Sequence, residues 1–114
     1  VVDQFELLCA DFFSLEQADI GAVNAFYDRA ALIALTPAQR PGYAAQLTKL
    51  LGHDGSGLLV TLEYNPSEMN GPPFSVPREE VYRLFDTAFT LEPLFHLDVL
   101  EENQKFRERI VATD

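Results

Sequence analysis

The feature that most constrains the fold is an apolar run that leads into a proline-rich loop. Residues 57–64 are Gly-Leu-Leu-Val-Thr-Leu-Glu-Tyr, a composition typical of a central strand that is covered on both faces. Pro72 and Pro73 follow in the next loop, and each proline fixes its φ angle and lacks a backbone N–H donor. The pattern predicts a stiff loop just past the carboxyl end of a buried strand, where open α/β sheets bind their ligands.

The size and charge of the chain narrow its class. With 114 residues, 47% of them hydrophobic, the chain is long enough for one small domain with a core and too short for two. The formal charge is −10, whereas phosphate-tracking nucleic-acid binders and basic membrane-surface helices need clustered Lys and Arg. No apolar run approaches the ~20 residues that span a bilayer. We therefore expect a small-molecule ligand, and neither nucleic acid nor membrane as a partner.

Cysteine and histidine usage gives expectations about compartment and metals. Cys9 is the only cysteine, so an internal disulfide is excluded, and without a charged-then-apolar leader the expected compartment is a reducing cytoplasm. Cys9 lies in an apolar stretch without a neighbouring histidine, which favours a buried, inert thiol over a nucleophile. His53 and His96 lack metal-ligand spacing with Cys9 or with each other, so no metal is expected.

The chain is predicted to alternate strands and helices. The predicted strands are residues 4–10, 22–27, 58–64 and 90–100. The predicted helices are residues 41–51 and 78–87, and Thr36-Pro37 has the signature of a helix start. The core face of the first helix is expected to carry Tyr43, Leu47, Leu50 and Leu51.

Three other segments have weaker patterns. Residues 29–35 are either helical or irregular, residues 52–57 are expected to form a flexible turn, and residues 101–109 a solvated helix or loop. The order strand, strand, helix, strand, helix, strand predicts an α/β fold, with a mostly parallel sheet and flanking helices.

On this topology, three polar and aromatic corners fall along one edge of the sheet, where we expect them to share a single cleft. The first corner is Asp11 with Phe12 and Phe13. Two interpretations of it stay open. The carboxylate can accept hydrogen bonds from an exocyclic amine while the aromatic rings sandwich adenine, or Asp11 caps a helix start and the two phenylalanines belong to the core.

The second and third corners surround Arg29 and the proline loop. Arg29 follows Asp28 at a predicted strand end and is one of only eight basic residues. Either it serves a binding site, or it forms an ion pair with Asp28 or another carboxylate. The third corner joins Tyr64 to the Gly-Pro-Pro-Phe loop of residues 71–74.

Several motifs together resemble one enzyme family. They are Phe-Tyr-Asp-Arg-Ala-Ala-Leu-Ile-Ala-Leu at residues 26–35, the strand at 57–64 and Gly-Pro-Pro-Phe-Ser-Val-Pro at 71–77. The similarity extends upstream through residues 9–15 and downstream through residues 98–103 and 106–109. The sequence resembles the thiopurine S-methyltransferase family, especially its bacterial members. Halide and thiol methyltransferases, with a related Gly-Gly-Pro-Pro loop, are the nearest alternative.

The resemblance implies a class I, Rossmann-like methyltransferase that uses S-adenosyl-L-methionine to methylate the sulfur of thiopurines, or related thiol, selenium or tellurium acceptors. It places Ala10, Asp11 and Phe12 near the adenine of the cofactor. Arg29 would contact substrate and cofactor and have a catalytic role with Asp28, and Pro72, Pro73 and Phe74 would wall the substrate side. A second family arginine cannot be assigned among Asn103, Lys105, Arg107 and Arg109.

The sequence also departs from the family pattern. The glycine-rich strand-turn-helix that holds the methionine part of the cofactor is missing, as is the acidic strand end that binds its ribose. A final strand, expected soon after Arg109, is not recognised before Asp114. We therefore expect residues 1–114 to be the second half of a methyltransferase domain, truncated at both ends. A non-catalytic binding or dimerisation module, associating through an exposed sheet edge, is the alternative.

Overall fold

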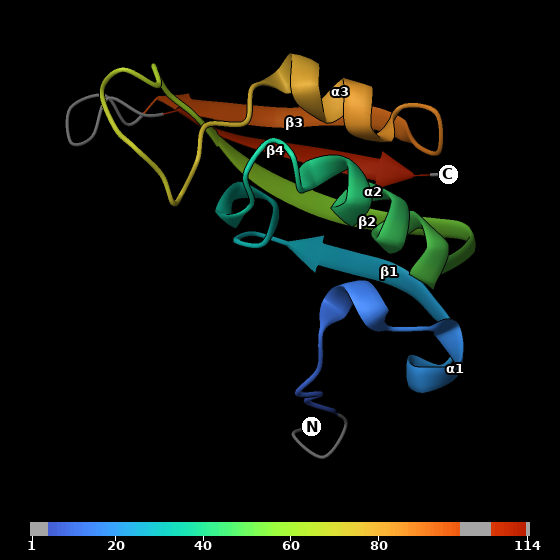
Figure 1. The fold of residues 1–114 in the computed structure, drawn as a ribbon. Helices are drawn as coiled ribbons and strands as arrows, with labels where there is room; N and C mark the ends of the chain where they lie inside the picture. Colours follow the sequence, from blue (N-terminus) through green and yellow to red (C-terminus); the bar gives the residue numbers. More distant parts are fainter. Residues whose placement is uncertain (1–4, 99–105, 114) are drawn as a thin grey trace.

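The computed structural model contains a sheet with the strand order β1-β2-β4-β3 (Figure 1). The strands are β1 (Val23–Asp28), β2 (Leu51–Glu63), β3 (Thr90–Asp98) and β4 (Phe106–Thr113). β1 pairs with β2 in parallel, and β4 runs antiparallel between β2 and β3. Three of the four strands in the described residues, 5–98 and 106–113, thus point the same way. This arrangement confirms the predicted α/β class with a mostly parallel sheet.

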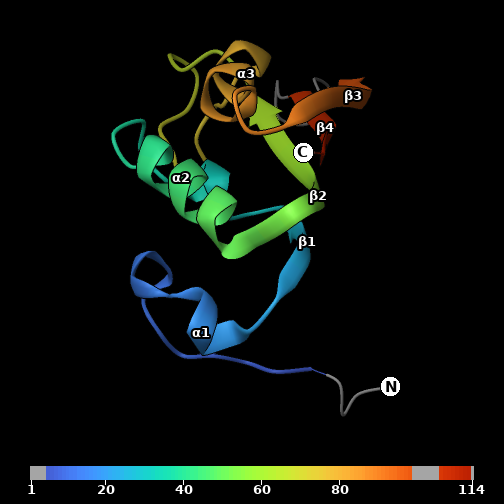
Figure 2. The ribbon, with the colours of Figure 1, turned by 90° about the vertical axis from the view of Figure 1, so that its right-hand side faces the viewer.

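Two helices cover one face of the sheet. They are α2 (Arg40–Leu50), which connects β1 to β2, and α3 (Arg78–Phe85), which follows β2. Figure 2 shows both on the same side of the strands. Shorter turns precede them: η2 (Phe12–Ser14), α1 (Gln17–Ile20) and η3 (Leu32–Ala34). None of the helices in the described residues has the length and apolar character needed to cross a bilayer.

The core lies between these helices and the sheet. In α2, the predicted core residues Tyr43, Leu47 and Leu50 are all buried, as is Leu51 at the start of β2. Residues 59–62 of β2 are four consecutive buried positions, so both faces of this strand are covered, as predicted. From α3, Val81 and Phe85 enter the same cluster. These positions are four apart and therefore share one helix face.

The start of α2 differs from the prediction. Thr36 does not cap the helix, because its hydroxyl and its backbone N–H both donate to the side-chain oxygen of Gln39. Residues 37–39 form a turn, and the helix begins at Arg40 with Pro41 in its first turn. The segment 29–35, left open between helical and irregular, contains the single 3-10 turn η3. The helix predicted over residues 78–87 is α3, which ends at Phe85.

The strand predicted at residues 4–10 is wrong. Residues 5–10 carry no strand and are exposed, Cys9 included, so the expectation of a buried thiol is wrong as well. A strand needs a neighbour to satisfy its backbone N–H and C=O groups, and none of the described strands pairs with this segment.

The flexible turn predicted at residues 52–57 is also wrong, because these residues belong to β2. The register with β1 is irregular here: Val23 pairs with Leu51 and Ala25 with Ser56, so β2 advances five residues while β1 advances two. The extra residues are accommodated in an irregularity where Asp54 has a φ of 65°. None of the glycines in this segment has a positive φ. At Gly57 the close approach of the Phe26 ring leaves no room for a side chain.

The charged segment at residues 101–109 was expected to be a helix or loop. Its first five residues lie outside the described part of the chain, but residues 106–109 begin β4, so a strand is present before Asp114. The charges at residues 107–109 obscure any strand pattern in the sequence. The strand forms because its backbone groups pair with β2 on one side and with β3 on the other. The strand predicted at 90–100 is β3, with residues 99 and 100 outside the described range.

Candidate functional site

Asp28, at the carboxyl end of β1, is buried and fully engaged. Only 4% of its surface is exposed. Its carboxylate accepts hydrogen bonds from the backbone N–H of Ala31 at 2.9 Å, from that of Leu32 at 3.3 and 3.4 Å, and from the hydroxyl of Tyr43 at 2.5 Å. These bonds hold the turn that leads from β1 into η3. The geometry makes Asp28 a support for that turn.

Arg29, the next residue, has a different environment. It is exposed and lines a hollow of about 160 Å³ with the apolar residues Ala30, Ile33, Val60 and Leu62. Among the residues that the structure describes, Arg29 takes part in no ion pair, so the alternative in which it neutralises Asp28 is not what the structure shows. An unpaired guanidinium beside an apolar hollow can hold an anionic group of a ligand.

The proline loop is fastened to both neighbouring elements. The backbone N–H of Phe74 donates to the carbonyl of Ile33 in η3 at 2.6 Å. The hydroxyl of Tyr64 donates to the carbonyl of Pro73 at 2.7 Å, next to the end of β2. A Cβ at Gly71 would lie 2.2 Å from the ring of Phe74, so the loop requires glycine there. The Arg29 turn and the loop are thus adjacent, as the sequence predicts.

Asp11 caps η2, as one of the two sequence interpretations proposed. Its carboxylate accepts hydrogen bonds from the backbone N–H of Phe13 at 3.0 Å and the hydroxyl of Ser14 at 3.2 Å. The matching expectation that both phenylalanines are core is wrong for Phe13, which is 45% exposed. Asp11 also lines a hollow of about 360 Å³ together with Ala10, so capping leaves it beside a space that a ligand can fill.

The single cleft expected from the sequence is absent from the described residues. Asp11, Arg29 and Phe74 line three separate hollows. Between the first two corners lie the buried side chains of Tyr43 and Asp28. The corners are nevertheless connected by a chain of contacts. The ring centroids of Phe12 and Tyr43 lie 5.4 Å apart, and the Tyr43 hydroxyl donates a hydrogen bond to Asp28. The carbonyl of Ile33 accepts one from the backbone N–H of Phe74.

The sequence predicted Tyr43 only as a core residue and did not identify its polar contact. Burial raises its pKa, and the hydrogen bond to Asp28 and the charge of Asp28 raise it further. The hydroxyl therefore remains protonated, and a donor to Asp28, to a higher pH than an exposed tyrosine would. The sequence signal available was a tyrosine at a core position, since a buried tyrosine hydroxyl normally finds a partner.

A second polar contact that the sequence did not reveal joins α2 to α3. The Arg40 guanidinium, 2% exposed, donates from Nη1 to both carboxylate oxygens of Glu80 at 2.8 and 2.9 Å, and from Nε to the carbonyl of Leu35. Arg40 and Glu80 form part of the wall of the hollow beside Phe74, which measures about 380 Å³.

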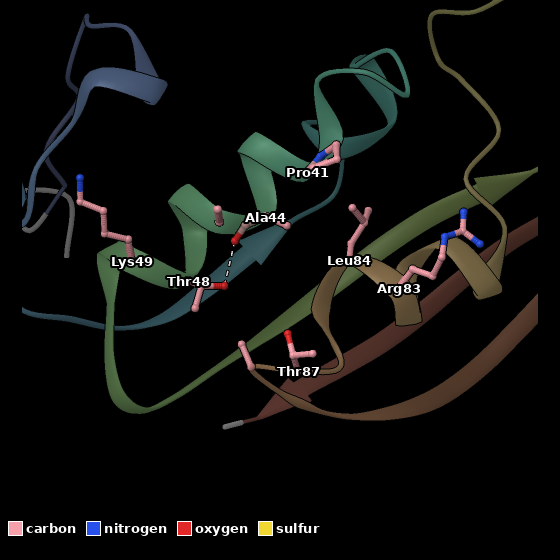
Figure 3. Close-up of a pocket in the computed structure, with 9 residues that line it drawn as sticks. Pro41, Ala44, Thr48, Lys49, Arg83, Leu84 and Thr87 are labelled. Atoms are coloured by element: carbon pink, nitrogen blue, oxygen red, sulfur yellow. Dashed lines mark hydrogen bonds between the residues drawn. The ribbon is translucent and has the colours of Figure 1, made fainter.

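A further hollow, of about 580 Å³, lies between α2 and α3 (Figure 3). Ala44 and Leu84 are among its apolar lining residues, and Lys49 and Arg83 contribute its cations. None of the residues predicted for the site lines it. It is therefore separate from the three corners at the carboxyl ends of the strands.

The candidates for a second arginine can be placed only in part. Lys105 and Asn103 lie outside the described residues. In the register of β4, Arg109 pairs with Val60 and Arg107 with Leu62, the two β2 residues that line the Arg29 hollow. No group of three or more His, Cys, Asp or Glu side chains in the described part of the chain is arranged to hold a metal ion.

Comparison with known proteins decides the family. The family model described as Thiopurine S-methyltransferase (TPMT) matches residues 1–113. The chain belongs to the thiopurine S-methyltransferase family. A Thiopurine S-methyltransferase of Pseudomonas fluorescens (strain Pf0-1) is 52% identical over 104 residues, which are 91% of this chain and 48% of the relative. One from Methylococcus capsulatus is 48% identical over 103 residues, 90% of this chain and 46% of the relative. The chain thus spans about half the length of these curated relatives.

Solved structures support the fold assignment. A SAM-dependent methyltransferase from Methanosarcina mazei superimposes with a TM-score of 0.67 at 13% identity, covering 92% of this chain and 65% of that one. The 1,6-didemethyltoxoflavin-N1-methyltransferase of Burkholderia thailandensis, solved with bound 1,6-didemethyltoxoflavin and S-adenosylhomocysteine, gives a TM-score of 0.61 at 18% identity, covering 94% of this chain and 49% of that one. At these identities the likeness establishes the methyltransferase fold, which confirms the Rossmann-like architecture expected from the resemblance.

Proposed function

We propose that the protein transfers a methyl group from S-adenosyl-L-methionine to the sulfur of a thiopurine or of a related thiol, selenium or tellurium acceptor. Membership of the thiopurine S-methyltransferase family supports the reaction class. The observation that carries the site assignment is Arg29, a cation without an ion-pair partner among the described residues, beside an apolar hollow at the carboxyl end of β1. We also propose that the protein acts in the cytoplasm.

In the proposed reaction, the main role of the protein is to position the two reactants and exclude water. The acceptor sulfur attacks the methyl carbon in line, the bond from that carbon to the sulfonium sulfur breaks, and the two opposite charges neutralise each other. Holding donor and acceptor in this geometry can contribute ~7 to 11 kcal/mol of barrier reduction in favourable systems. A nearby guanidinium favours the anionic acceptor, and apolar walls that exclude water strengthen that effect.

The residues divide between the two reactants. Ala10, Asp11 and Phe12 are proposed for the adenine side, where Ala10 and Asp11 line one hollow. Arg29 is proposed as the catalytic residue that contacts the acceptor and borders the cofactor, and Asp28 as the support of its turn. Pro72, Pro73 and Phe74 are proposed as the wall on the acceptor side.

Substitution of Arg29 tests the proposal. In the active enzyme, Arg29→Ala should lower turnover with thiol acceptors about tenfold or more, equivalent to ~1.4 kcal/mol per factor of ten, while the cofactor Kd changes less. Arg29→Lys should recover part of the loss because it restores the charge. Arg83→Ala removes another exposed cation, outside the proposed site, and is the matched control. Equal losses of turnover and cofactor affinity in Arg29→Ala would refute the assigned role.

Substrate choice and assembly are tested separately. Turnover is measured with a panel of thiopurine, simple thiol, halide, selenite and tellurite acceptors. The acceptor that is methylated fastest distinguishes a thiopurine enzyme from a halide or thiol methyltransferase. We propose that self-association occurs through β1, which is one of the two edge strands of the described sheet and carries Tyr27 at 63% exposure. Light scattering over a concentration series measures it. Association without saturable cofactor binding would favour a non-catalytic module.

A further inference from the structure

Helix α2 makes polar contacts with both turns that carry proposed site residues. Tyr43 and Gln46 are three residues apart and so share one face of the helix. Both are buried, at 7% and 8% exposure. Neither side chain bonds within its own helix. Each reaches a different turn.

Tyr43 reaches the turn of Arg29. Its hydroxyl donates to Oδ2 of Asp28, whose carboxylate accepts the backbone N–H groups of Ala31 and Leu32. Arg29 lies in the chain between Asp28 and the two residues whose amides bind the Asp28 carboxylate. The orientation of the Arg29 backbone is therefore determined by a carboxylate that Tyr43 holds in place.

Gln46 reaches the turn of Asp11. Its Nε2 donates both hydrogens to backbone carbonyls, that of Phe12 at 2.9 Å and that of Leu15 at 2.7 Å. These carbonyls lie at the two ends of η2, which Asp11 caps. The Phe12 ring also packs against the ring of Tyr43 at 5.4 Å. One helix face therefore contacts both corners and sets the distance between them.

We propose that Tyr43 and Gln46 are positioning residues that hold the cofactor-side turn and the acceptor-side turn at a fixed separation. Their polar atoms are buried, and a buried donor is costly unless it is bonded. Apolar side chains fill the same space without that cost, so polar residues here serve to fix the two turns. The inference rests on the proposed function, which assigns Asp11 to the cofactor and Arg29 to the acceptor.

Two conservative substitutions separate the two contacts. Tyr43→Phe keeps the ring against Phe12 and removes the donor to Asp28. Gln46→Met keeps the chain length and removes both donors to η2. Thr48→Val is the matched control on the same helix, because the Thr48 hydroxyl donates only to the Ala44 carbonyl of α2 itself.

In the active enzyme, Tyr43→Phe should lower kcat/KM for the acceptor about tenfold and leave the cofactor Kd within about twofold. Misplacement of a group by about 1 Å can cost up to about a hundredfold, so tenfold corresponds to a partial shift. Gln46→Met should raise the cofactor Kd about tenfold and leave kcat at saturating cofactor within about twofold. Thr48→Val should change neither constant. If both variants lower both constants equally, their role is general stability and the inference is wrong.

Amide hydrogen exchange provides a readout that needs no activity. Tyr43→Phe should speed exchange at Ala31 and Leu32, and Gln46→Met at Phe13 and Leu15, with the other turn unaffected in each case. If Tyr43→Phe does not fold, Asp28→Asn weakens the same contact and should give the same pattern. Unchanged exchange in these turns overturns the inference. If the wild-type protein neither binds cofactor nor transfers methyl groups, the proposed function fails, while exchange still decides whether α2 positions the turns.

Discussion

Two apolar runs of similar composition differ completely in burial. Leu7, in the stretch of residues 5–10, is 96% exposed, whereas Leu59 in β2 is 2% exposed. Residue 59 belongs to a strand that pairs with β1 on one side and β4 on the other, under helices on one face. Residues 5–10 pair with no described strand. An apolar run is buried only where other segments supply both hydrogen bonds and cover.

Two ion pairs between described residues show the same difference between buried and exposed positions. Arg40 and Glu80 join α2 to α3 inside the packed part, with side chains 2% and 15% exposed. Lys49 and Glu16 join α2 to the N-terminal segment at 3.3 Å, with side chains 52% and 63% exposed. Removing one partner of a buried pair leaves a charge that water cannot reach, whereas an exposed charge is simply solvated.

The largest expected effect follows from this contrast. Arg40→Met should lower the free energy of unfolding by about 3–5 kcal/mol, because Glu80 then keeps a largely buried charge without its partner. Lys49→Met should cost less than about 1 kcal/mol. Urea unfolding followed by circular dichroism measures both. Similar losses in the two variants would show that the packed and exposed regions do not differ as described.

The same substitution in the two apolar runs is the next test. Leu59→Ala should cost about 2–5 kcal/mol, since it removes core contacts and leaves a cavity. Leu7→Ala should change stability by no more than about 0.5 kcal/mol, because its side chain already faces solvent. A loss of more than about 1 kcal/mol in Leu7→Ala, measured by thermal and urea unfolding, would show that residues 5–10 are packed in solution.

Glycine substitutions compare close packing in the sheet with the looser contact near η2. A Cβ at Gly57 in β2 would lie 2.1 Å from the Phe26 ring, so Gly57→Ala should cost about 1–3 kcal/mol. At Gly42 in α2, the nearest atom is in the Phe13 ring at 3.8 Å, an ordinary contact. Gly42→Ala should therefore stabilise the protein by up to about 1 kcal/mol through helix propensity. Differential scanning calorimetry distinguishes the opposite signs.

The smallest effect concerns pH. Because burial and Asp28 raise the pKa of Tyr43 in the folded state above its unfolded value of about 10, the stability that it contributes is complete below about pH 10. That stability is lost as pH rises from there toward the folded pKa. Above about pH 10, wild-type stability should fall by ~1.4 kcal/mol per pH unit more steeply than that of Tyr43→Phe.

Urea unfolding at about pH 9 and about pH 11 measures the two slopes. Tyr27→Phe, on an exposed ring, is the control and should keep the wild-type slope. Equal slopes for wild type and Tyr43→Phe would mean that Tyr43 is not buried against Asp28 in solution.

The sequence predicted well where the signal is local. The apolar run of β2 and the core face of α2 were both predicted, since apolar periodicity lies within a few residues. The proximity of Arg29 to the proline loop was predicted from the strand order, but the single cleft expected to join them to Asp11 was wrong. The predictions failed at residues 5–10, 52–57 and 106–109. At these three places the outcome depends on pairing with another segment: no described strand pairs with residues 5–10, the register of residues 52–57 with β1 is irregular, and β4 pairs between β2 and β3.

In the candidate site, too, some residues were predicted from the sequence, and others were found only in the structure. Asp28 and Arg29 are adjacent, and the sequence singled out both. It left open whether Arg29 pairs with a carboxylate. The structure shows Asp28 occupied by Tyr43 and two backbone amides, which leaves the guanidinium unpaired among the described residues. Gln46 gave no signal, because a glutamine on a helix becomes informative only once its acceptors are known.

By itself the sequence determined the α/β class, the central strand, the two main helices and the family resemblance, because each is encoded in short-range patterns of apolar residues, prolines and motifs. Only the tertiary structure decided which apolar run is buried, where β4 pairs and how α2 connects the two turns. The reason is that strand pairing, burial and side-chain contacts depend on segments that the chain brings together from outside the local sequence, as the hydrogen bond from Gln46 to Phe12 illustrates at a separation of 34 residues.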